Sequence, residues 1–110
     1  MKTLTKRANF VDMQKNAQSF VTTGLIVQYA PKDEGGVVVG YTASRKVGGA
    51  VQRNFAKRRM RHLARLVLAD QSPACYVLIA RTACLTLPFE TLHRDLKWAL
   101  RRLKGEPKND

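Results

Sequence analysis

The sequence predicts an α/β sandwich, of the α+β kind, in which helices pack on one small mixed β-sheet. Segments 19–30, 37–44 and 74–80 are rich in β-branched, aromatic or other apolar residues, as strands are. Segments 50–69 and 88–104 carry apolar residues at the spacing of a helix face packed on a sheet. With a shorter helix expected near the N-terminus, the order of elements is α-β-β-α-β-α.

The length of 110 residues is that of one domain. We therefore expect a single domain over residues 1–110, with a frayed tail from about 105 to 110. A domain of this size buries about 65% of the surface that its unfolded chain would expose, so one modest core is expected. The composition, 45% hydrophobic and 25% charged, is typical of an ordinary globular protein.

In the N-terminal half we expect a short helix at 4–16 and a strand at 19–30. The strand ends at a proline- and glycine-containing turn at 31–36, and a second strand follows at 37–44. Apolar side chains alternate along this second strand, which indicates one well-buried face. The short connection favours an antiparallel hairpin between the two strands.

In the C-terminal half, segment 50–69 contains neither glycine nor proline and predicts a long helix. Segment 74–80, ACYVLIA, is almost continuously apolar, as a central strand is. The last helix is expected at 88–104, with Pro88 at its first position and Gly105 as its stop. If the strands at either end of 37–80 are parallel, the general rule predicts a right-handed crossover.

The charge indicates a polyanion as partner. There are 20 lysines and arginines against 8 acidic residues, which gives a formal charge of +12 and a pI near 10.4. Nucleic acid is the first candidate. An anionic membrane surface is the second, but it needs a helix whose apolar anchors have no other core to join. Because no apolar run of signal-peptide or membrane-spanning length occurs, we expect a cytoplasmic protein without a membrane partner.

The positive charge is concentrated before and within the long helix. No acidic residue lies between Glu34 and Asp70, and eight cationic ones do: Arg45, Lys46, Arg53, Lys57, Arg58, Arg59, Arg61 and Arg65. At about 100° per residue, one arc of the helix collects Asn54, Lys57, Arg58, Arg61 and Arg65, with Arg53 at its margin. The opposite arc collects Phe55, Ala56, Met60, Leu63, Leu66 and Val67. The pattern predicts a helix that packs by one face and presents cations on the other.

A solvated surface is the ordinary explanation of a charge run, but a merely soluble helix mixes both signs. Here the like charges repel, so an external anion is favoured, and arginine suits bidentate contact with phosphate oxygens. The pair Gly48 and Gly49 precedes the helix. A plain tight connection explains the pair, and a close approach of the backbone to an anion is the alternative that the flanking cations favour.

Residues 44–61 read SRKVGGAVQRNFAKRRMR. This ordered pattern of serine, basic pair, glycine, Ala-Val and arginine-rich helix resembles the protein subunit of bacterial ribonuclease P. The N-terminal LTKRANF and the later CYVLIARTACLTLPFETLHRDL are also similar to that family. Three positions depart from its pattern: Phe55 replaces an arginine, Gly49 replaces the usual asparagine, and Gln14 replaces an aromatic residue. We expect the core to absorb Phe55.

The resemblance implies a binding role in which the catalytic RNA of ribonuclease P is the partner and the catalyst. The implied RNA-binding residues are Arg45, Lys46, Gly48, Arg53, Asn54, Lys57, Arg58, Arg61 and Arg65. It also implies that a cleft holds the single-stranded 5′ leader of precursor tRNA, with Lys6, Phe10 and Tyr29 as its residues. Core packing is the equal alternative for the two aromatic residues. The family's unusual left-handed β-α-β crossover is implied as well, against the general rule.

The residues themselves indicate no catalytic site. Two-metal hydrolysis needs clustered carboxylates, and the eight acids are scattered along the chain. Neither His62 nor His93 has a readable partner for acid–base work, and Cys75 and Cys84 are best explained as reduced thiols. We therefore expect no catalytic, metal or cofactor site in the protein, with magnesium in the RNA active site, and no obligate protein partner. A generic or ribosomal-type RNA-binding protein and an autonomous nuclease are the alternatives.

Overall fold

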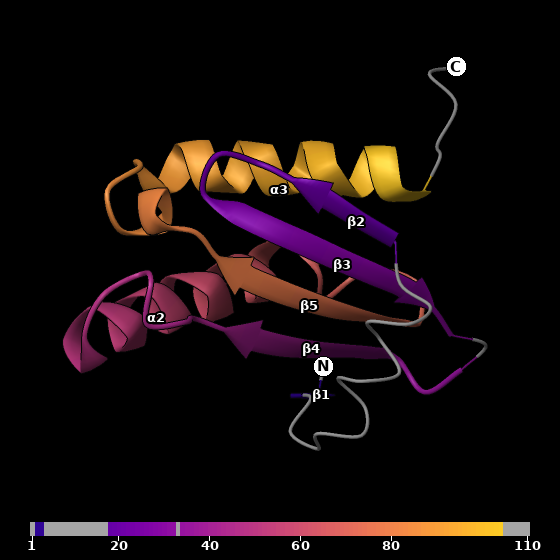
Figure 1. Cartoon of the computed structure of the whole chain (residues 1–110). Helices are drawn as coiled ribbons and strands as arrows, with labels where there is room; N and C mark the ends of the chain where they lie inside the picture. Colours follow the sequence, from indigo (N-terminus) through magenta and orange to yellow (C-terminus); the bar gives the residue numbers. More distant parts are fainter. Residues whose placement is uncertain (1, 4–17, 33, 105–110) are drawn as a thin grey trace.

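The computed structural model describes residues 2–3, 18–32 and 34–104, which form two helices packed on one face of a mixed sheet (Figure 1). In chain order the elements are β1 (Lys2–Thr3), β2 (Gln18–Val21), β3 (Leu25–Pro31), β4 (Val37–Thr42), α2 (Ala50–Val67), β5 (Ala74–Ala80), the 3₁₀ turn η1 (Thr82–Leu85) and α3 (Phe89–Lys104). The sheet order is β1-β4-β5-β3-β2. The predicted sandwich with a small mixed sheet is confirmed.

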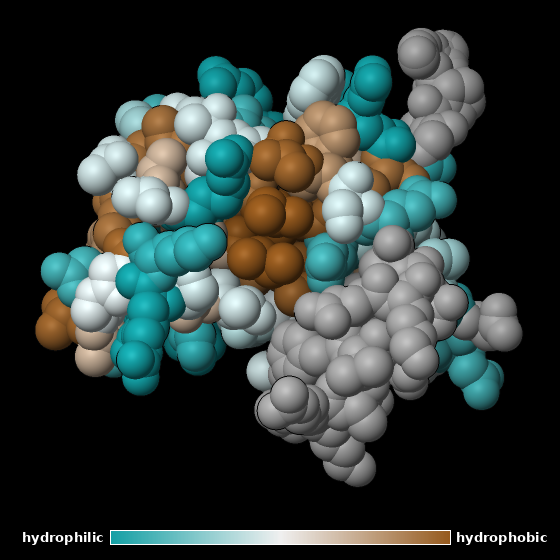
Figure 2. Space-filling model, in the orientation of Figure 1, coloured by the Kyte–Doolittle hydropathy of each residue, from teal (hydrophilic) through white to brown (hydrophobic). Residues whose placement is uncertain are grey.

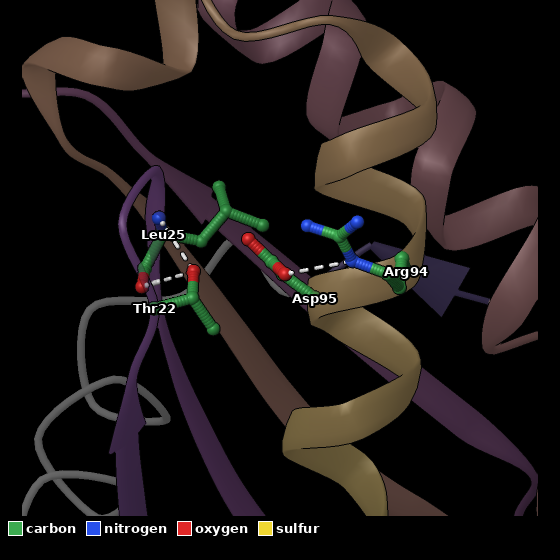
Figure 3. Close-up of polar contacts among 4 residues, drawn as sticks. All are labelled: Thr22, Leu25, Arg94 and Asp95. Carbon is green, nitrogen blue, oxygen red and sulfur yellow. Dashed lines mark hydrogen bonds and ion pairs between the residues drawn. The ribbon is translucent and has the colours of Figure 1, made fainter.

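The predicted hairpin between 19–30 and 37–44 is wrong. Segment 19–30 divides into two antiparallel strands, β2 and β3, and β5 lies between β3 and β4. A tight turn makes the division: the Thr22 hydroxyl donates to the Leu25 carbonyl at 3.0 Å and accepts the Leu25 N–H at 3.0 Å (Figure 3). Gly24 completes this turn under α3, where a Cβ would lie 2.6 Å from Leu92 Cδ2.

The central place of β5 follows from its composition. It pairs antiparallel with β3 and parallel with β4 along its whole length. Tyr76 and Leu78 are fully buried on the face that carries the helices, and Val77 is 2% exposed on the other face. A strand apolar on both faces is stabilised most where neighbours pair with both of its edges.

The crossover from β4 through α2 to β5 is left-handed. In Figure 1 the two strands point the same way, β5 lies above β4, and α2 lies behind the sheet. The general right-handed rule is therefore wrong here, and the handedness implied by the family resemblance is confirmed. The rule assumes a strand whose twist feeds directly into its helix. In this chain residues 43–49 intervene and include a turn at 45–47.

The core lies between the sheet and the two helices. Leu25, Val27 and Val39 of the strands are fully buried against Met60 and Leu63 of α2 and against Leu92 and Leu96 of α3. The opposite face of the sheet carries a smaller apolar group, in which Val38 and Ile79 pack beside Val77. Figure 2 shows apolar surface over the middle of this face. No helix in the described part of the chain is long and apolar enough to cross a membrane.

The helix expected at 4–16 and the tail expected at 105–110 lie outside the described residues. Both long helices agree with their predicted positions to within two residues at each end. Helix α3 begins after Pro88, whose carbonyl accepts the N–H groups of Thr91 and Leu92 at 3.0 and 3.2 Å. Proline at this place donates no hydrogen bond and fits the start of a helix.

Candidate nucleic-acid interface

A short turn between β4 and α2 presents two cations. The N–H of Lys46 donates to the Ser44 hydroxyl oxygen at 3.3 Å, and the N–H of Gly48 donates to the Arg45 carbonyl at 3.2 Å. Val47 is buried beneath the turn, whereas Arg45 and Lys46 are exposed. The turn is thus fixed to the core by the packing of Val47, and its two basic side chains are exposed to solvent.

Gly48 is required by the geometry of this turn. Its φ is +152°, which L side chains rarely adopt, and a Cβ there would lie 2.7 Å from the Cβ of Gln52. Gly49, the N-cap of α2, has an ordinary extended conformation and provides no side-chain cap. The first turn of α2 also has no acidic residue, so no carboxylate of its own offsets the positive end of the helix dipole.

The structure brings the predicted RNA-binding residues together on the turn and one face of α2. Those that are exposed are Arg45, Lys46, Asn54, Arg58, Arg61 and Arg65; those that are half-buried are Gly48, Arg53 and Lys57. The buried residues of the helix are Ala56, Met60, Leu63, Ala64 and Val67. The two-faced helix is therefore present as predicted. We call the turn and the outer face of α2, residues 44–48, 53, 54, 57, 58, 61 and 65, the basic face.

The cations of the basic face have no carboxylate partner among the described residues. In that part of the chain one ion pair forms, between Arg94 and Asp95 of α3 at 3.6 Å. Arg61 instead lies 5.6 Å from the ring centroid of Tyr41 on β4. Burial raises the pKa of Tyr41, and the nearby charges of Arg61 and Arg65 partly oppose that rise. Within the described residues, the charge of the basic face is thus not neutralised by any carboxylate.

Phe55 is not absorbed by the core, contrary to the expectation. Its side chain is 38% exposed and lies between two arginines, with the guanidinium carbons of Arg58 and Arg59 at 5.7 and 5.4 Å from its ring centroid. Leu66, placed on the same apolar arc, is 55% exposed. Each lies one residue, about 100° on the helix, away from a buried neighbour. The sheet and α3 cover a narrower stripe of α2 than the arc predicted.

Arg59 has a structural role that separates it from its neighbours. Its guanidinium donates to the Cys84 carbonyl of η1 at 2.8 Å and lies 6.0 Å from the Phe89 ring centroid. Burial raises the pKa of the Cys84 thiol, and the charge of Arg59 opposes that rise. Arg59 therefore ties α2 to η1 and the start of α3.

Of the three predicted leader-binding residues, only Tyr29 lies in the described part of the chain. Lys6 and Phe10 lie outside the described residues. Tyr29 lies on the helix-bearing face of the sheet, where its ring packs 5.4 Å from that of Tyr76 and Lys104 Nζ lies 5.9 Å from its centroid. The structure thus shows the core-packing alternative for Tyr29, whose role in leader binding stays a prediction.

Sequence reasoning missed two aromatic residues that touch arginines. Tyr41, on the strand expected at 37–44, contacts Arg61 of the basic face. Its place four residues before the basic pair of Arg45 and Lys46 is the available signal. Trp98 of α3 is 52% exposed beside Arg102.

No group of three or more His, Cys, Asp or Glu side chains with the spacing of a metal site occurs within 2–3, 18–32 and 34–104. In the same ranges no disulfide joins Cys75, which is half-buried, to Cys84, which is buried. What the described site offers chemically is a concentration of guanidinium and ammonium groups at a glycine-containing turn. These groups bind phosphate oxygens by charge-assisted hydrogen bonds.

The sequence is similar to known proteins along nearly its whole length. The ribonuclease P family model matches residues 1–104. The ribonuclease P protein component of Ruegeria pomeroyi is 44% identical over 106 residues, covering 91% of this chain and 84% of that protein. The corresponding protein of Paramagnetospirillum magneticum is 36% identical over 107 residues, covering 91% and 80%.

Solved structures share the fold. The RNase P protein of Staphylococcus aureus superposes with a TM-score of 0.81 at 22% identity, covering 94% of this chain and 96% of that one. The RNase P protein of Thermotoga maritima superposes with a TM-score of 0.75 at 23% identity, covering 96% and 98%. With the family model matching nearly the whole length and relatives above 30% identity, this chain belongs to the ribonuclease P protein family, the protein subunits of the endoribonuclease that matures the 5′ ends of tRNA.

Proposed function

We propose that this chain binds the catalytic RNA of ribonuclease P through the basic face and assists that RNA in removing the 5′ leader of precursor tRNA. The observation that supports the proposal most directly is the division of α2. One side is fully packed through Met60 and Leu63, while the other presents cations that no carboxylate of the described residues neutralises. Such a surface gains free energy by displacing the counterions of RNA phosphates.

The geometry of the basic face supports contact with a folded RNA backbone. The cations extend from the turn at 44–48 along α2 to Arg65, and helical residues rise about 1.5 Å each. Arg53 and Arg65 therefore lie about 18 Å apart along the helix axis. A row of this length reaches several successive phosphates. We assign the phosphate contacts to Arg53, Lys57, Arg58, Arg61 and Arg65, assisted by Asn54, by Arg45 and Lys46, and by the close backbone approach at Gly48.

The cleavage chemistry belongs to the RNA in this proposal, with its magnesium ions in the RNA active site. The protein contributes by holding the complex and by holding the unpaired leader. Aromatic side chains hold unpaired bases with little sequence preference, and the resemblance assigns this task to Lys6, Phe10 and Tyr29. Because Tyr29 packs on Tyr76 in the structure, we place less of the leader contact on it than on the N-terminal residues.

Reconstitution tests the proposal. The protein, a bacterial ribonuclease P RNA from a related organism and a precursor tRNA are combined at low magnesium, and release of the 5′ leader is measured. We expect the protein alone to be inert and to accelerate cleavage by the RNA. Replacing Arg53 and Arg58 together by Gln should remove that acceleration and leave the unfolding transition unchanged.

Two outcomes would contradict the proposal. Tight RNA binding without any acceleration would indicate a generic RNA-binding protein. Leader release by the pure protein, lost when Asp70 or Asp95 is replaced by Asn, would indicate an autonomous nuclease.

A further inference from the structure

The outer face of α3 carries the single tryptophan of the chain between cations. Trp98 is 52% exposed, whereas the buried stripe of this helix is formed by Leu92, Leu96, Ala99, Leu100 and Leu103. Arg94 and Arg102 lie one turn before and one turn after Trp98, in a single i, i+4, i+8 row. Exposing the tryptophan ring to water costs more free energy than exposing the charged side chains of this helix, so the position of Trp98 needs an explanation.

The Trp98 ring is held in place by its neighbours. The Phe20 ring of β2 meets it edge to face, with centroids 5.4 Å apart and planes at 75°. The guanidinium carbon of Arg102 lies 5.4 Å from the Trp98 centroid. A ring fixed in this way loses little conformational freedom when a planar group stacks on it, and an arginine beside it adds a cation–π contribution.

Two hollows in the surface have Trp98 in their lining. A hollow of about 480 Å³ is lined by His93, Arg94, Asp95, Lys97, Trp98 and Arg101. A second one, of about 220 Å³, extends from Trp98 over Phe20 and Val21 of β2. The larger volume lies within the range of about 300–1,000 Å³ usual for small-ligand sites.

The positive charge of this surface indicates that it binds an anionic ligand. Arg94, Lys97, Arg101 and Arg102 are four cations, and the one carboxylate among them, Asp95, pairs with Arg94 at 3.6 Å, so the formal sum is 4 − 1 = +3. Figure 3 shows Asp95 directed from α3 toward the turn of Thr22 and Leu25. The four cations are all exposed. A partner that carries negative charge can pair with these cations, and one that also has flat apolar rings can stack on the tryptophan. Unpaired RNA has both.

This surface is separate from the basic face. Trp98 packs on β2, which forms one edge of the sheet, whereas Arg61 contacts β4 near the other edge. We propose that the outer face of α3, centred on Trp98 with Arg94, Lys97, Arg101 and Arg102, is a second RNA-binding surface that stacks an unpaired base on the tryptophan. The inference depends on the proposed function only in taking RNA as the polyanion.

Because the chain has one tryptophan, fluorescence excited selectively at tryptophan reports on this surface alone. The whole protein is titrated with a ten-nucleotide oligouridine at low salt. We expect saturable quenching of Trp98. The double replacement Arg101→Gln with Arg102→Gln should raise the apparent Kd about tenfold, equivalent to about 1.4 kcal/mol. The matched control, Arg53→Gln with Arg58→Gln on α2, should leave that Kd unchanged within about twofold.

A second measurement does not use the tryptophan as reporter. With fluorescein-labelled oligouridine and the α2 double replacement as background, Trp98→Leu should weaken binding about tenfold, and circular dichroism should show an unchanged fold. The inference is overturned if the oligouridine causes no quenching, if quenching follows the α2 replacements rather than the α3 replacements, or if Trp98→Leu binds as before. Any of these results can coexist with normal leader cleavage, so they leave the proposed function standing.

Discussion

Two adjacent arginines of α2 should respond in opposite ways to the same substitution. Arg58 is exposed on the basic face, and its guanidinium has no carboxylate partner among the described residues. Arg59 is half-buried and donates to the Cys84 carbonyl at 2.8 Å. Replacing each separately by Gln removes one charge from the same helix. The two variants therefore have equal net charge and differ only in which contact is lost.

The magnitudes follow from those contacts. If about five phosphates are neutralised, the slope of log K against log salt concentration is roughly −4. Arg58→Gln removes one phosphate contact, so the slope should become less negative by about 0.7–0.9, with the free energy of unfolding unchanged within about 0.5 kcal/mol. Arg59→Gln removes a hydrogen bond from a charged donor in a partly exposed place. It should cost about 1–2 kcal/mol of stability and leave the slope nearly unchanged.

The assay is binding of the catalytic RNA between about 50 and 400 mM monovalent salt, with urea unfolding of the free protein at the same salt concentrations. Equal changes of slope for the two variants would show that net charge alone controls binding. The assignment of Arg58 to RNA and Arg59 to the fold would then be refuted. A wild-type slope near zero would refute the electrostatic account as a whole.

Three further tests concern the packing. Phe55→Ala should lower the free energy of unfolding by about 1 kcal/mol, because Phe55 is 38% exposed. Met60 is fully buried, so Met60→Ala should lower it by about 2–5 kcal/mol. Urea unfolding measures both, and equal losses would place Phe55 in the core. The hydroxyl of Tyr76 is buried without a hydrogen-bond partner among the described residues. Burial is the main cause that raises its pKa, and the neighbouring Tyr29 raises it further. The unfolded state therefore ionises at lower pH than the folded state, and stability is lost as pH rises above about 10. Tyr76→Phe should reduce that loss and should stabilise the protein by about 1 kcal/mol at neutral pH. A destabilised variant would show that the hydroxyl has a hydrogen-bond partner. Gly48→Ala should lower the free energy of unfolding by about 1–2 kcal/mol, because Gly48 has a positive φ. Gly49 lies in extended backbone, so Gly49→Ala should be tolerated. Equal losses of stability in the thermal unfolding of the two variants would contradict this account.

Local patterns predicted the elements but not which strands are neighbours. The apolar run at 74–80 was correctly read as a central strand, and β5 spans Ala74–Ala80. Its insertion between β3 and β4 was not expected, because the short connection at 31–36 favoured a hairpin. Strand order depends on where a doubly apolar strand gains most by burial, which is a property of the whole sheet. The division of segment 19–30 was visible in principle, since Thr22, Thr23 and Gly24 are turn formers.

The faces of α2 were predicted by residue spacing, and the errors lie at the margins. Ala56, Met60, Leu63 and Val67 are buried as expected. Phe55 and Leu66 are exposed because the width of the stripe that the sheet and α3 cover cannot be known from the helix alone. The role of Arg59 was equally hidden. It depends on the carbonyl of Cys84, which lies 25 positions away in the sequence.

The packing of α2 explains how the chain tolerates an uncompensated row of cations. Arg53, Lys57, Arg61 and Arg65 follow one another at i, i+4, and three such like-charge pairs cost about 1 kcal/mol in total. Because burial of residues such as Met60 supplies the stability of the helix, the outer face does not need acidic partners. Salt therefore acts in opposite directions on the two equilibria. It screens the repulsion and stabilises the free protein, while it weakens the complex by opposing counterion release. The binding slope of a variant is meaningful only beside its stability at each salt concentration, which is why the Arg58 and Arg59 variants must be compared in both measurements.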